Sequence, residues 1–423
     1  MKMKKSDITW ASIIPLIGGQ SIGVMNFLDD KLPEYVLTYP AFAKNDSHFY
    51  NYLRTRRAWT DEPIIIDSKT NVLMNSDDAK RMKYVDIVNV VPPCAGLSGM
   101  STISGGGCPA NDWMYLSSEF VLKNIKPKVM FGENAPRLAT NGGKQVRDRL
   151  FAIAKKYGYS VAFYKTSSVL HGLCQNRPRT FFFLFKSEFA PLLKYFKEDM
   201  VPFVDQIGPA LDPNDKMACF VGKRGQPIIP TQDVHYKYLL EEIMHMSHPE
   251  FIAQLGANTK VIDLIAKLDG GFHKFIKWCA KNNMDKEQTR AEFAQAKMDS
   301  KMGFWQHGLL ATPLSGPAQA FVSDAPWASI HPTEDRCLSI REGLRMMGLP
   351  DDFELLGAPR NANHMCQNVP VPTAYDMTDI AAAFVLDQLQ CSGSDRIMVD
   401  NFKQVTTSES VMSPSTLEDF LSN

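Results

Sequence analysis

Short apolar runs alternate with amphipathic stretches along the first half of the chain. The runs have the length of buried strands and lie at 86–90, 128–132 and 181–185. Between them, apolar residues recur at helical spacing in 113–121 and 146–157. Strands and helices that alternate in this way predict an α/β domain with a doubly wound, Rossmann-like and mostly parallel sheet over 12–186.

The pattern changes after residue 186, so the first domain should comprise residues 1–186. Residues 187–325 surround one helical stretch with prolines and polar spans, and we expect a second, smaller domain there. Residues 326–390 should return to the first domain, because they end in an apolar helical face at Ala382, Val385, Leu386 and Leu389. The polar, Ser-rich residues 391–423 are predicted to be a flexible tail.

Length and charge agree with this division and limit the partners. At 423 residues and 47.5 kDa the chain exceeds what one hydrophobic core usually supports. Its 46 basic and 46 acidic residues cancel, so nothing global attracts it to a polyanion. A nucleic-acid site would need a local basic surface. Residues 272–278 mix aromatics with lysines, which suits either backbone contact or an ordinary amphipathic helix.

Cysteine usage predicts a reducing compartment, and we expect a cytoplasmic protein. The eight cysteines form no CxxC pair and no cluster with histidine at metal-ligand spacing, so we expect free thiols and no metal. No stretch reaches the ~18 apolar residues of a membrane helix. The first 16 residues are similar to a signal peptide, but Pro15 and the glycine pair that follows favour a strand and a turn.

Three candidate chemical groups adjoin the predicted strands. Cys94 follows the first run through two prolines, and Glu133 and Asn134 end the second. A third group precedes the last run and projects to one side at strand spacing: Gln175, Arg177 and Arg179. Reactive groups of open α/β sheets lie at the carboxyl ends of strands, so a nucleophilic thiol is one interpretation. The other interpretation is purely structural: the cysteine belongs to the core, the acid caps a turn and the two arginines lie on a solvated strand face.

In this order the segments resemble the cytosine-5 DNA methyltransferases, which join a Pro-Cys turn, a Glu-Asn pair and a Gln-x-Arg-x-Arg segment. Residues 336–342 and 348–353 are similar to the family's arginine-plus-helix element, and 367–371 to its last motif. The resemblance covers 12–186 and 326–390, and five motifs in the right order make it specific. It implies a methyltransferase fold in which 187–325 is the target-recognition domain.

The resemblance implies a covalent mechanism on cytosine. The Cys94 thiolate would add to carbon 6, Glu133 would hold N3 and the exocyclic amine, and Arg179 would hold the O2 side. Other residues would order or support the site: Pro93, Ser98, Asn134, Gln175 and Arg177. Because a stacked base cannot present carbon 6, the cytosine would be flipped out of the duplex under a flap at 97–112.

The implied methyl donor is S-adenosylmethionine, bound by the turn after the first strand. Ile14, Gly18 and Gly19 would form this turn, Asp77 would contact the adenine and Asn368 would close the site. The chain departs from the family at several positions: Ile14 replaces a phenylalanine, Leu16 and Gln367 replace glycines, Ala95 replaces a glutamine, and 35–40 supplies no carboxylate for the ribose.

Three functions stay open on these residues. The chain can be a DNA cytosine-5 methyltransferase of a phage or a restriction-modification system, with a divergent donor pocket. It can instead use the same thiol chemistry with an altered donor or on RNA, or be a catalytically silent DNA-binding protein of this fold. The first is favoured, because a binding module has no need of a nucleophile. It would act as a monomer on double-stranded DNA, with a cognate restriction nuclease as a candidate partner. We expect a cytoplasmic, nucleoid-associated protein of a bacterial or phage-infected cell.

Overall fold

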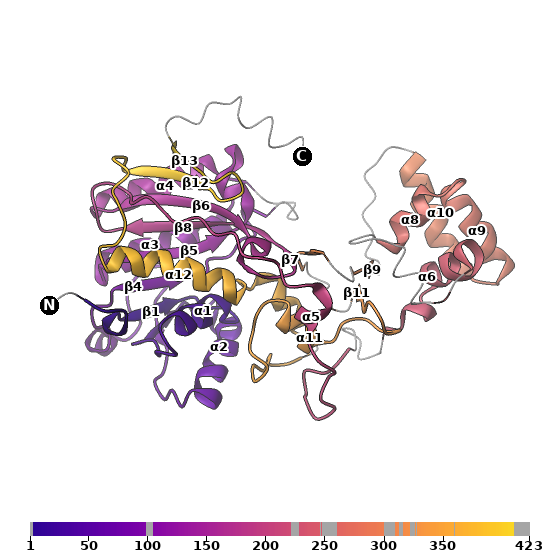
Figure 1. Cartoon of the computed structure of the whole chain (residues 1–423), viewed down its shortest axis with the longest axis horizontal. Helices are drawn as coiled ribbons and strands as arrows, with labels where there is room; N and C mark the ends of the chain where they lie inside the picture. The colour runs from indigo at the N-terminus through magenta and orange to yellow at the C-terminus, as the bar shows by residue number, and fades with distance from the viewer. Residues whose placement is uncertain are drawn as a thin grey trace. The chain divides into compact units, whose positions relative to one another are not determined.

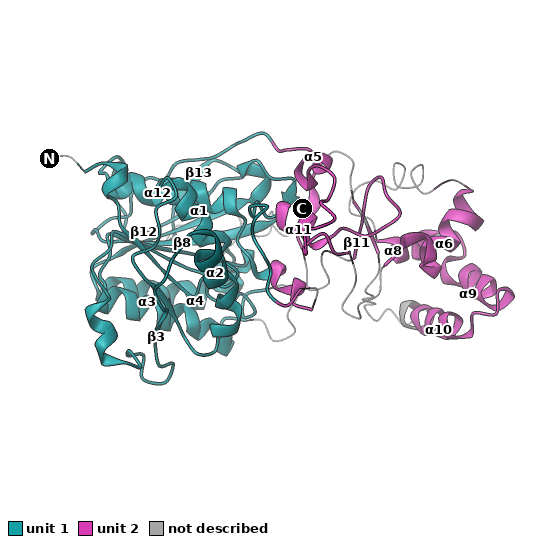
Figure 2. Cartoon of the chain, turned by 90° about the horizontal axis from the view of Figure 1, so that it is seen from below, with its two compact units in different colours: residues 1–199, 347–356, 367–423 teal, residues 200–346, 357–366 magenta. Residues whose placement is uncertain are grey.

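The computed structural model describes residues 3–98, 105–220, 228–245, 247, 260–299, 309–312, 316–321, 326, 328–358 and 360–409. The chain divides into two compact units (Figure 2). Unit 1 comprises residues 1–199, 347–356 and 367–423, and unit 2 comprises 200–346 and 357–366. Unit 1 therefore resumes at residue 347, whereas the sequence analysis placed the return at 326.

A single large sheet forms the centre of unit 1. Among the described residues it has nine strands, in the order β13-β12-β6-β8-β5-β4-β1-β2-β3 (Figure 1). Neighbouring strands are parallel except where β8 and β13 pair antiparallel to the strands beside them. The strands are β1 (Trp10–Ile13), β2 (Val36–Thr38), β3 (Ile64–Ile65), β4 (Ile87–Val90), β5 (Val129–Asn134), β6 (Ser160–Ser167), β8 (Pro178–Phe185), β12 (Arg396–Asp400) and β13 (Val405–Ser408).

Helices cover both faces of this sheet, so the predicted doubly wound α/β fold is confirmed. α1 (Gly19–Phe27) packs against α12 (Val371–Val385) on one face, and α3 (Asp112–Asn124) packs against α4 (Lys144–Lys156) on the other (Figure 2). Gly23 permits the close approach of α1 to α12, because an added Cβ would lie 2.5 Å from the Cβ of Ala374. The shorter elements of unit 1 are α2 (Ala43–Arg56), β7 (Gln175–Asn176), η1 (Lys5–Asp7), η2 (Ser76–Lys80), η3 (Pro109–Asn111), η4 (Pro136–Ala139), η5 (Asn141–Gly143) and η6 (Ser168–His171).

The strand order places the chemistry of unit 1 at one edge. β1 has β2 on one side and β4 on the other, which makes the crevice between β1 and β4 a topological switch point. Ligands of open α/β sheets bind at the carboxyl ends of strands at such a point. β8 runs antiparallel to β5 and pairs Thr180 with Asn134, so the start of β8 lies at this same edge.

The carboxyl-terminal residues complete the sheet, and the predicted flexible tail is wrong for residues 396–409. Ile397, Met398 and Val399 of β12 are buried where the strand pairs with β6. Arg147 of α4 forms an ion pair with Glu409 in which both side chains are buried. The segment around this strand is polar, and the short apolar run 397–399 was the available signal for it. Residues 410–423 lie outside the described residues.

Unit 2 contains a helical cluster with an aromatic core. Phe272, Phe275 and Trp278 of α9 (Gly271–Lys281) are buried, so the aromatics of 272–278 belong to an amphipathic helix and are not free to stack on bases. The other elements of unit 2 are α5 (Phe203–Ile207), η7 (Pro230–Gln232), α6 (Val234–Tyr238), η8 (Leu239–Met244), α8 (Val261–Lys267), α10 (Asp285–Asp299), β9 (Leu310–Ala311), β10 (Ala318–Gln319), β11 (Ser329–Ile330), α11 (Ile340–Arg345) and η9 (Ala362–Gln367).

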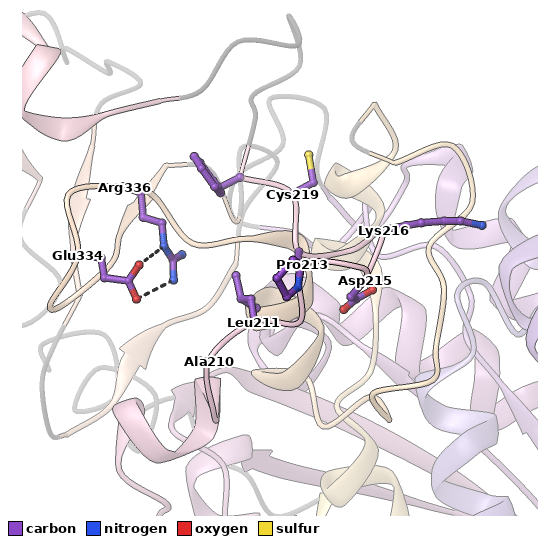
Figure 3. A pocket seen from close by; sticks show the side chains of 10 residues that line it. Ala210, Leu211, Pro213, Asp215, Lys216, Cys219, Glu334 and Arg336 are labelled. Atoms are coloured by element: carbon purple, nitrogen blue, oxygen red, sulfur yellow. Dashed lines mark hydrogen bonds and ion pairs between the residues drawn. The ribbon is translucent and has the colours of Figure 1, made fainter.

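The arginine-plus-helix segment forms a buried ion-pair network within unit 2. Ser339 and Glu342 make a capping box at the start of α11. Arg336 lies 2.8 Å from Glu342 and 2.7 Å from Glu334. Burial raises the pKa of Glu342, but the hydrogen bonds from Arg336 and His331 outweigh it and hold this pKa well below its usual range. Arg336 and Glu334 also line a pocket of about 540 Å³ (Figure 3).

Candidate active site

Cys94 lies just beyond the carboxyl end of β4, at the switch-point edge. Val91 and Pro92 are buried, and Cys94 is partly buried at the start of a turn in which the Leu97 amide donates to the Cys94 carbonyl over 3.0 Å. Asn134 at the end of β5 donates to the carbonyl of Pro93 over 3.4 Å. The adjacent strand therefore holds the approach to the thiol in place.

Glu133 and Arg179 form the ionic centre of this edge. The Arg179 Nε lies 2.5 Å from the Glu133 Oε1, and the Glu133 side chain is only 4% exposed. Arg177 is 1% exposed and donates from Nη2 to the carbonyl of Asn368 over 3.0 Å. Both guanidinium groups and Glu133 are close enough to Cys94 for their charges to shift its pKa. The structure thus brings together four residues singled out in the sequence: Cys94, Glu133, Arg177 and Arg179.

The two acids of this cluster compete for the same positive charge. Burial raises the pKa of the Cys94 thiol, the charge of Glu133 raises it further, and Arg179 and Arg177 lower it without cancelling the rise. Burial likewise raises the pKa of Glu133 against the two arginines. Ionisation of either group therefore disfavours ionisation of the other. Glu133 thus raises the pKa of Cys94, while Arg179 and Arg177 lower the pKa of both groups.

This coupling predicts how the thiol of Glu133→Gln titrates. Removal of the Glu133 charge leaves the arginines unopposed, so the pKa of Cys94 should fall. Arg179→Gln removes a favourable charge and should raise it. The measurement is the pH dependence of Cys94 alkylation by iodoacetamide, read by mass spectrometry on the peptide that contains Cys94. A rise in Glu133→Gln would show that the carboxylate does not act on this thiol.

The turn between β1 and α1 keeps a glycine-like backbone despite its unusual sequence. Leu16, where the family has a glycine, has φ +52°, and Gly18 has φ +106°. The Gly19 amide donates to the Asn368 Oδ1 over 2.9 Å. A Cβ on Gly19 would lie 2.1 Å from the Val369 carbonyl, so this turn requires glycine there. Asn368 thus links the turn to Arg177, which it contacts through its own carbonyl.

Asp46, in the first turn of α2, supports this turn, and the sequence analysis missed it. It is fully buried, accepts the Leu16 amide over 2.8 Å and accepts a short hydrogen bond from the Thr38 hydroxyl. Burial raises its pKa to about 8, although the hydrogen bonds from Thr38 and Leu16 lower it. The available signal was an acid at the start of a helix after the second strand. Asp46 lies beyond 35–40, the segment in which the family's ribose-binding carboxylate was expected.

Two other residues proposed from the sequence are Asp77 and Ser98. Asp77 lies in η2 with a side chain that is 78% exposed, and it pairs with Lys80 over 3.0 Å, whereas the turn residues are buried. The acid that directly follows β3 is instead Asp67, which accepts the amides of Lys69 and Thr70. Ser98 is half-buried beside residues 99–104, so the centre of the predicted flap lies outside the described residues.

Some buried polar atoms at this edge have no hydrogen-bond partner among the described residues. Gln175 is fully buried, and neither end of its amide is paired. The Nδ2 of Asn368 and the Oε1 of Gln20 are in the same state. An unpaired buried amide is costly, so such atoms commonly bind water or a ligand. No described helix is long and apolar enough to cross a membrane, and no group of acids, histidines and cysteines in the described part could hold a metal.

The arrangement of a thiol, an acid and two arginines coincides with a family match over most of the chain. A family model described as C-5 cytosine-specific DNA methylase matches residues 17–380. The chain belongs to this family. Its members use S-adenosylmethionine as the methyl donor.

One solved structure supports the fold, and two further structures are similar at a lower score. A protein described as a DNA modification methyltransferase encoded within a prophage of E. coli is 14% identical, with a TM-score of 0.51 over 88% of this chain and 99% of that one. The Entamoeba histolytica methyltransferase EhMeth is 11% identical, with a TM-score of 0.49 over 90% and 98% of the two chains. The S. pombe Dnmt2 methyltransferase is 9% identical, with a TM-score of 0.49 over 90% and 98%. No curated protein matches the sequence.

The turn between β1 and α1, called the donor turn below, fits S-adenosylmethionine through its backbone and through Asn368. The left-handed residues and Gly19 form the kind of turn that lets backbone approach a cofactor, at the switch point where such ligands bind. The unpaired Nδ2 of Asn368 is a free donor beside it. The fit is incomplete at the ribose position, because no carboxylate directly follows β2, where Tyr39 and Pro40 stand. The first acid after β2 in the sequence is Asp46, which is already bonded to Leu16 and Thr38.

Proposed function

We propose that the protein is a DNA (cytosine-5-)-methyltransferase that acts on a flipped-out cytosine through a covalent bond to Cys94. The observation that carries this proposal is the Glu133–Arg179 ion pair beside the Cys94 thiol at the carboxyl ends of β4 and β5. Carbon 5 of cytosine is a poor nucleophile while the ring is aromatic, and addition of a thiolate at carbon 6 activates it. A silent binding protein would not need a buried acid beside a buried thiol.

The cluster can supply both the nucleophile and the proton that the addition needs. The Cys94 thiolate forms a bond to carbon 6, and the electron pair displaced from the ring is neutralised by a proton delivered to N3 from Glu133. The raised pKa of Glu133 suits a carboxyl group that must hold a proton near neutral pH. Arg179, paired with Glu133, would donate hydrogen bonds to the O2 side of the ring, where negative charge develops.

The later steps release the base and restore the thiol. Bound S-adenosylmethionine would supply an electrophilic methyl group, and Gly18, Gly19 and Asn368 would hold it. Glu133 recovers the N3 proton. Transfer of the carbon 5 proton to solvent water and departure of the Cys94 thiolate with the electron pair of the C6–S bond then restore the aromatic ring. Asn134 and the two prolines before Cys94 keep the sulfur in place during both events.

Methyl transfer to duplex DNA is the direct test of this function. Labelled S-adenosylmethionine should transfer its label to carbon 5 of cytosine in unmethylated duplex DNA, and sequencing of DNA from expressing cells should give the target sequence. RNA of the same sequences is the comparison. Label that appears only in RNA would replace the proposed substrate, and no label in either would contradict the function. Monomeric action and a cognate nuclease remain predictions.

A further inference from the structure

The helix α9 presents lysines on one face and buries aromatics on the other. At 100° per residue, Lys274, Lys277 and Lys281 lie within about 60° of one another and extend for about 10 Å along the axis. Phe272, Phe275, Trp278 and Cys279 form the buried face, which adjoins the lysines at Trp278. α9 contains three lysines and no acid in Gly271–Lys281. The exposed residues of this helix are therefore basic or uncharged, and its packed core holds the helix in place.

Two of these three lysines have no ion-pair partner among the described residues. Lys277 and Lys281 are exposed and make no ion pair with any described residue. Lys274 pairs over 3.1 Å with Asp269, a side chain that is 99% exposed, and such surface pairs are weak. All five basic residues of α4, by contrast, are paired with acids, as in Lys144–Asp148, Arg149–Asp112, Lys155–Asp395, Lys156–Glu119 and Arg147–Glu409.

We propose that the basic face of α9 binds the phosphate backbone of duplex DNA. The inference rests on the proposed function, which makes duplex DNA the substrate, and it names a surface that holds it. A chain with zero net charge cannot rely on a global field, so its contact with a polyanion must come from local unpaired cations. Lysine ammonium groups on a rigid helix suit phosphates, and the burial of the aromatic residues assigns them no role in reading bases.

The salt dependence of binding tests this surface. Log K falls as log salt rises, and each lost phosphate contact on B-DNA makes this slope less steep by about 0.9. Lys277→Gln with Lys281→Gln should therefore reduce the magnitude of the slope by about 1.8. Lys286→Gln with Arg290→Gln on α10 is the matched control: it removes the same charge from exposed helical positions that have Asp285 and Glu287 beside them. The control should keep the slope of the wild-type protein. Circular dichroism verifies that both variants are folded.

The outcomes separate this inference from the proposed function. An unchanged slope in the α9 variant, or an equal decrease in the α10 variant, would overturn the assignment of the surface. If the wild-type protein methylates duplex DNA and the α9 variant keeps the wild-type salt slope, only the assignment of the surface is refuted. Wild-type protein that binds RNA hairpins more tightly than duplex DNA, and methylates only RNA, would refute the duplex substrate and this inference together.

Discussion

Cys94→Ser should lower kcat/KM for methyl transfer by roughly 10³-fold or more, because a serine hydroxyl is far less able than a thiolate to add to carbon 6. The change replaces the sulfur with an oxygen at a position whose surroundings are held by Asn134 and the preceding prolines. The DNA-binding residues are untouched, so affinity for duplex DNA should stay within a few-fold. Initial rates with labelled donor and equilibrium binding to the same duplex measure the two effects.

The control for this variant is Cys391→Ser, which changes an exposed free thiol beyond α12. It should keep wild-type rates. Methyl transfer by Cys94→Ser within tenfold of wild type would mean that the sulfur is not the nucleophile. Equal losses of rate and of DNA affinity would instead indicate damage to the fold, and a thermal melt distinguishes that outcome.

Glu133→Gln should lower kcat by about 10²- to 10⁴-fold, the range expected when a general acid is lost. Glutamine keeps the size of the side chain and an oxygen that can accept from Arg179, but it cannot deliver a proton to N3. The same variant should lower the pKa of Cys94, because the opposing charge is gone. The variant should thus show a lower pKa of Cys94 together with a lower kcat. A purely structural role for Glu133 would not produce both changes.

The measurement is single-turnover methyl transfer combined with the alkylation profile of Cys94. Glu119→Gln is the control, since Glu119 is a partly exposed acid of α3 that pairs with Lys156 at 2.8 Å. A kcat in Glu133→Gln equal to that of the control would remove the carboxyl group from the chemistry. A lowered kcat with an unchanged thiol pKa would separate Glu133 from the electrostatics of Cys94.

The sheet and the catalytic cluster could be predicted because their signals are local in the sequence. Apolar runs mark β4, β5 and β8, and the carboxyl ends of parallel strands meet at one edge, so Cys94 and Glu133 are expected to lie together. Arg179 lies at the start of β8 and joins them because β8 runs antiparallel to β5, which the predicted mostly parallel sheet did not specify. The left-handed backbone of Leu16 also agrees with the family glycine that it replaces. Such a position tolerates leucine only at a cost in strain.

The errors arise where structure depends on partners that are distant in the chain. β12 pairs with β6 and is buried by that pairing, although its sequence lies in a polar segment. Asp46 reaches the donor turn only because α2 folds back over it. The contact of Asp77 with the adenine stays a prediction, and the structure shows this side chain exposed beside Lys80. Spacing alone does not distinguish an acid in a pocket from an acid on a surface helix.

The central claim is a covalent bond between Cys94 and a cytosine ring, and a trapping experiment tests it most directly. A duplex with 5-fluorocytosine at the target cytosine, incubated with protein and S-adenosylmethionine, should yield a stable complex. Release needs loss of a proton from carbon 5, and the fluorine that replaces this hydrogen cannot leave as a cation. Tandem mass spectrometry of the digested complex should place the modified base on the peptide that contains Cys94. An adduct on another residue, or one that persists in Cys94→Ser, would contradict the account.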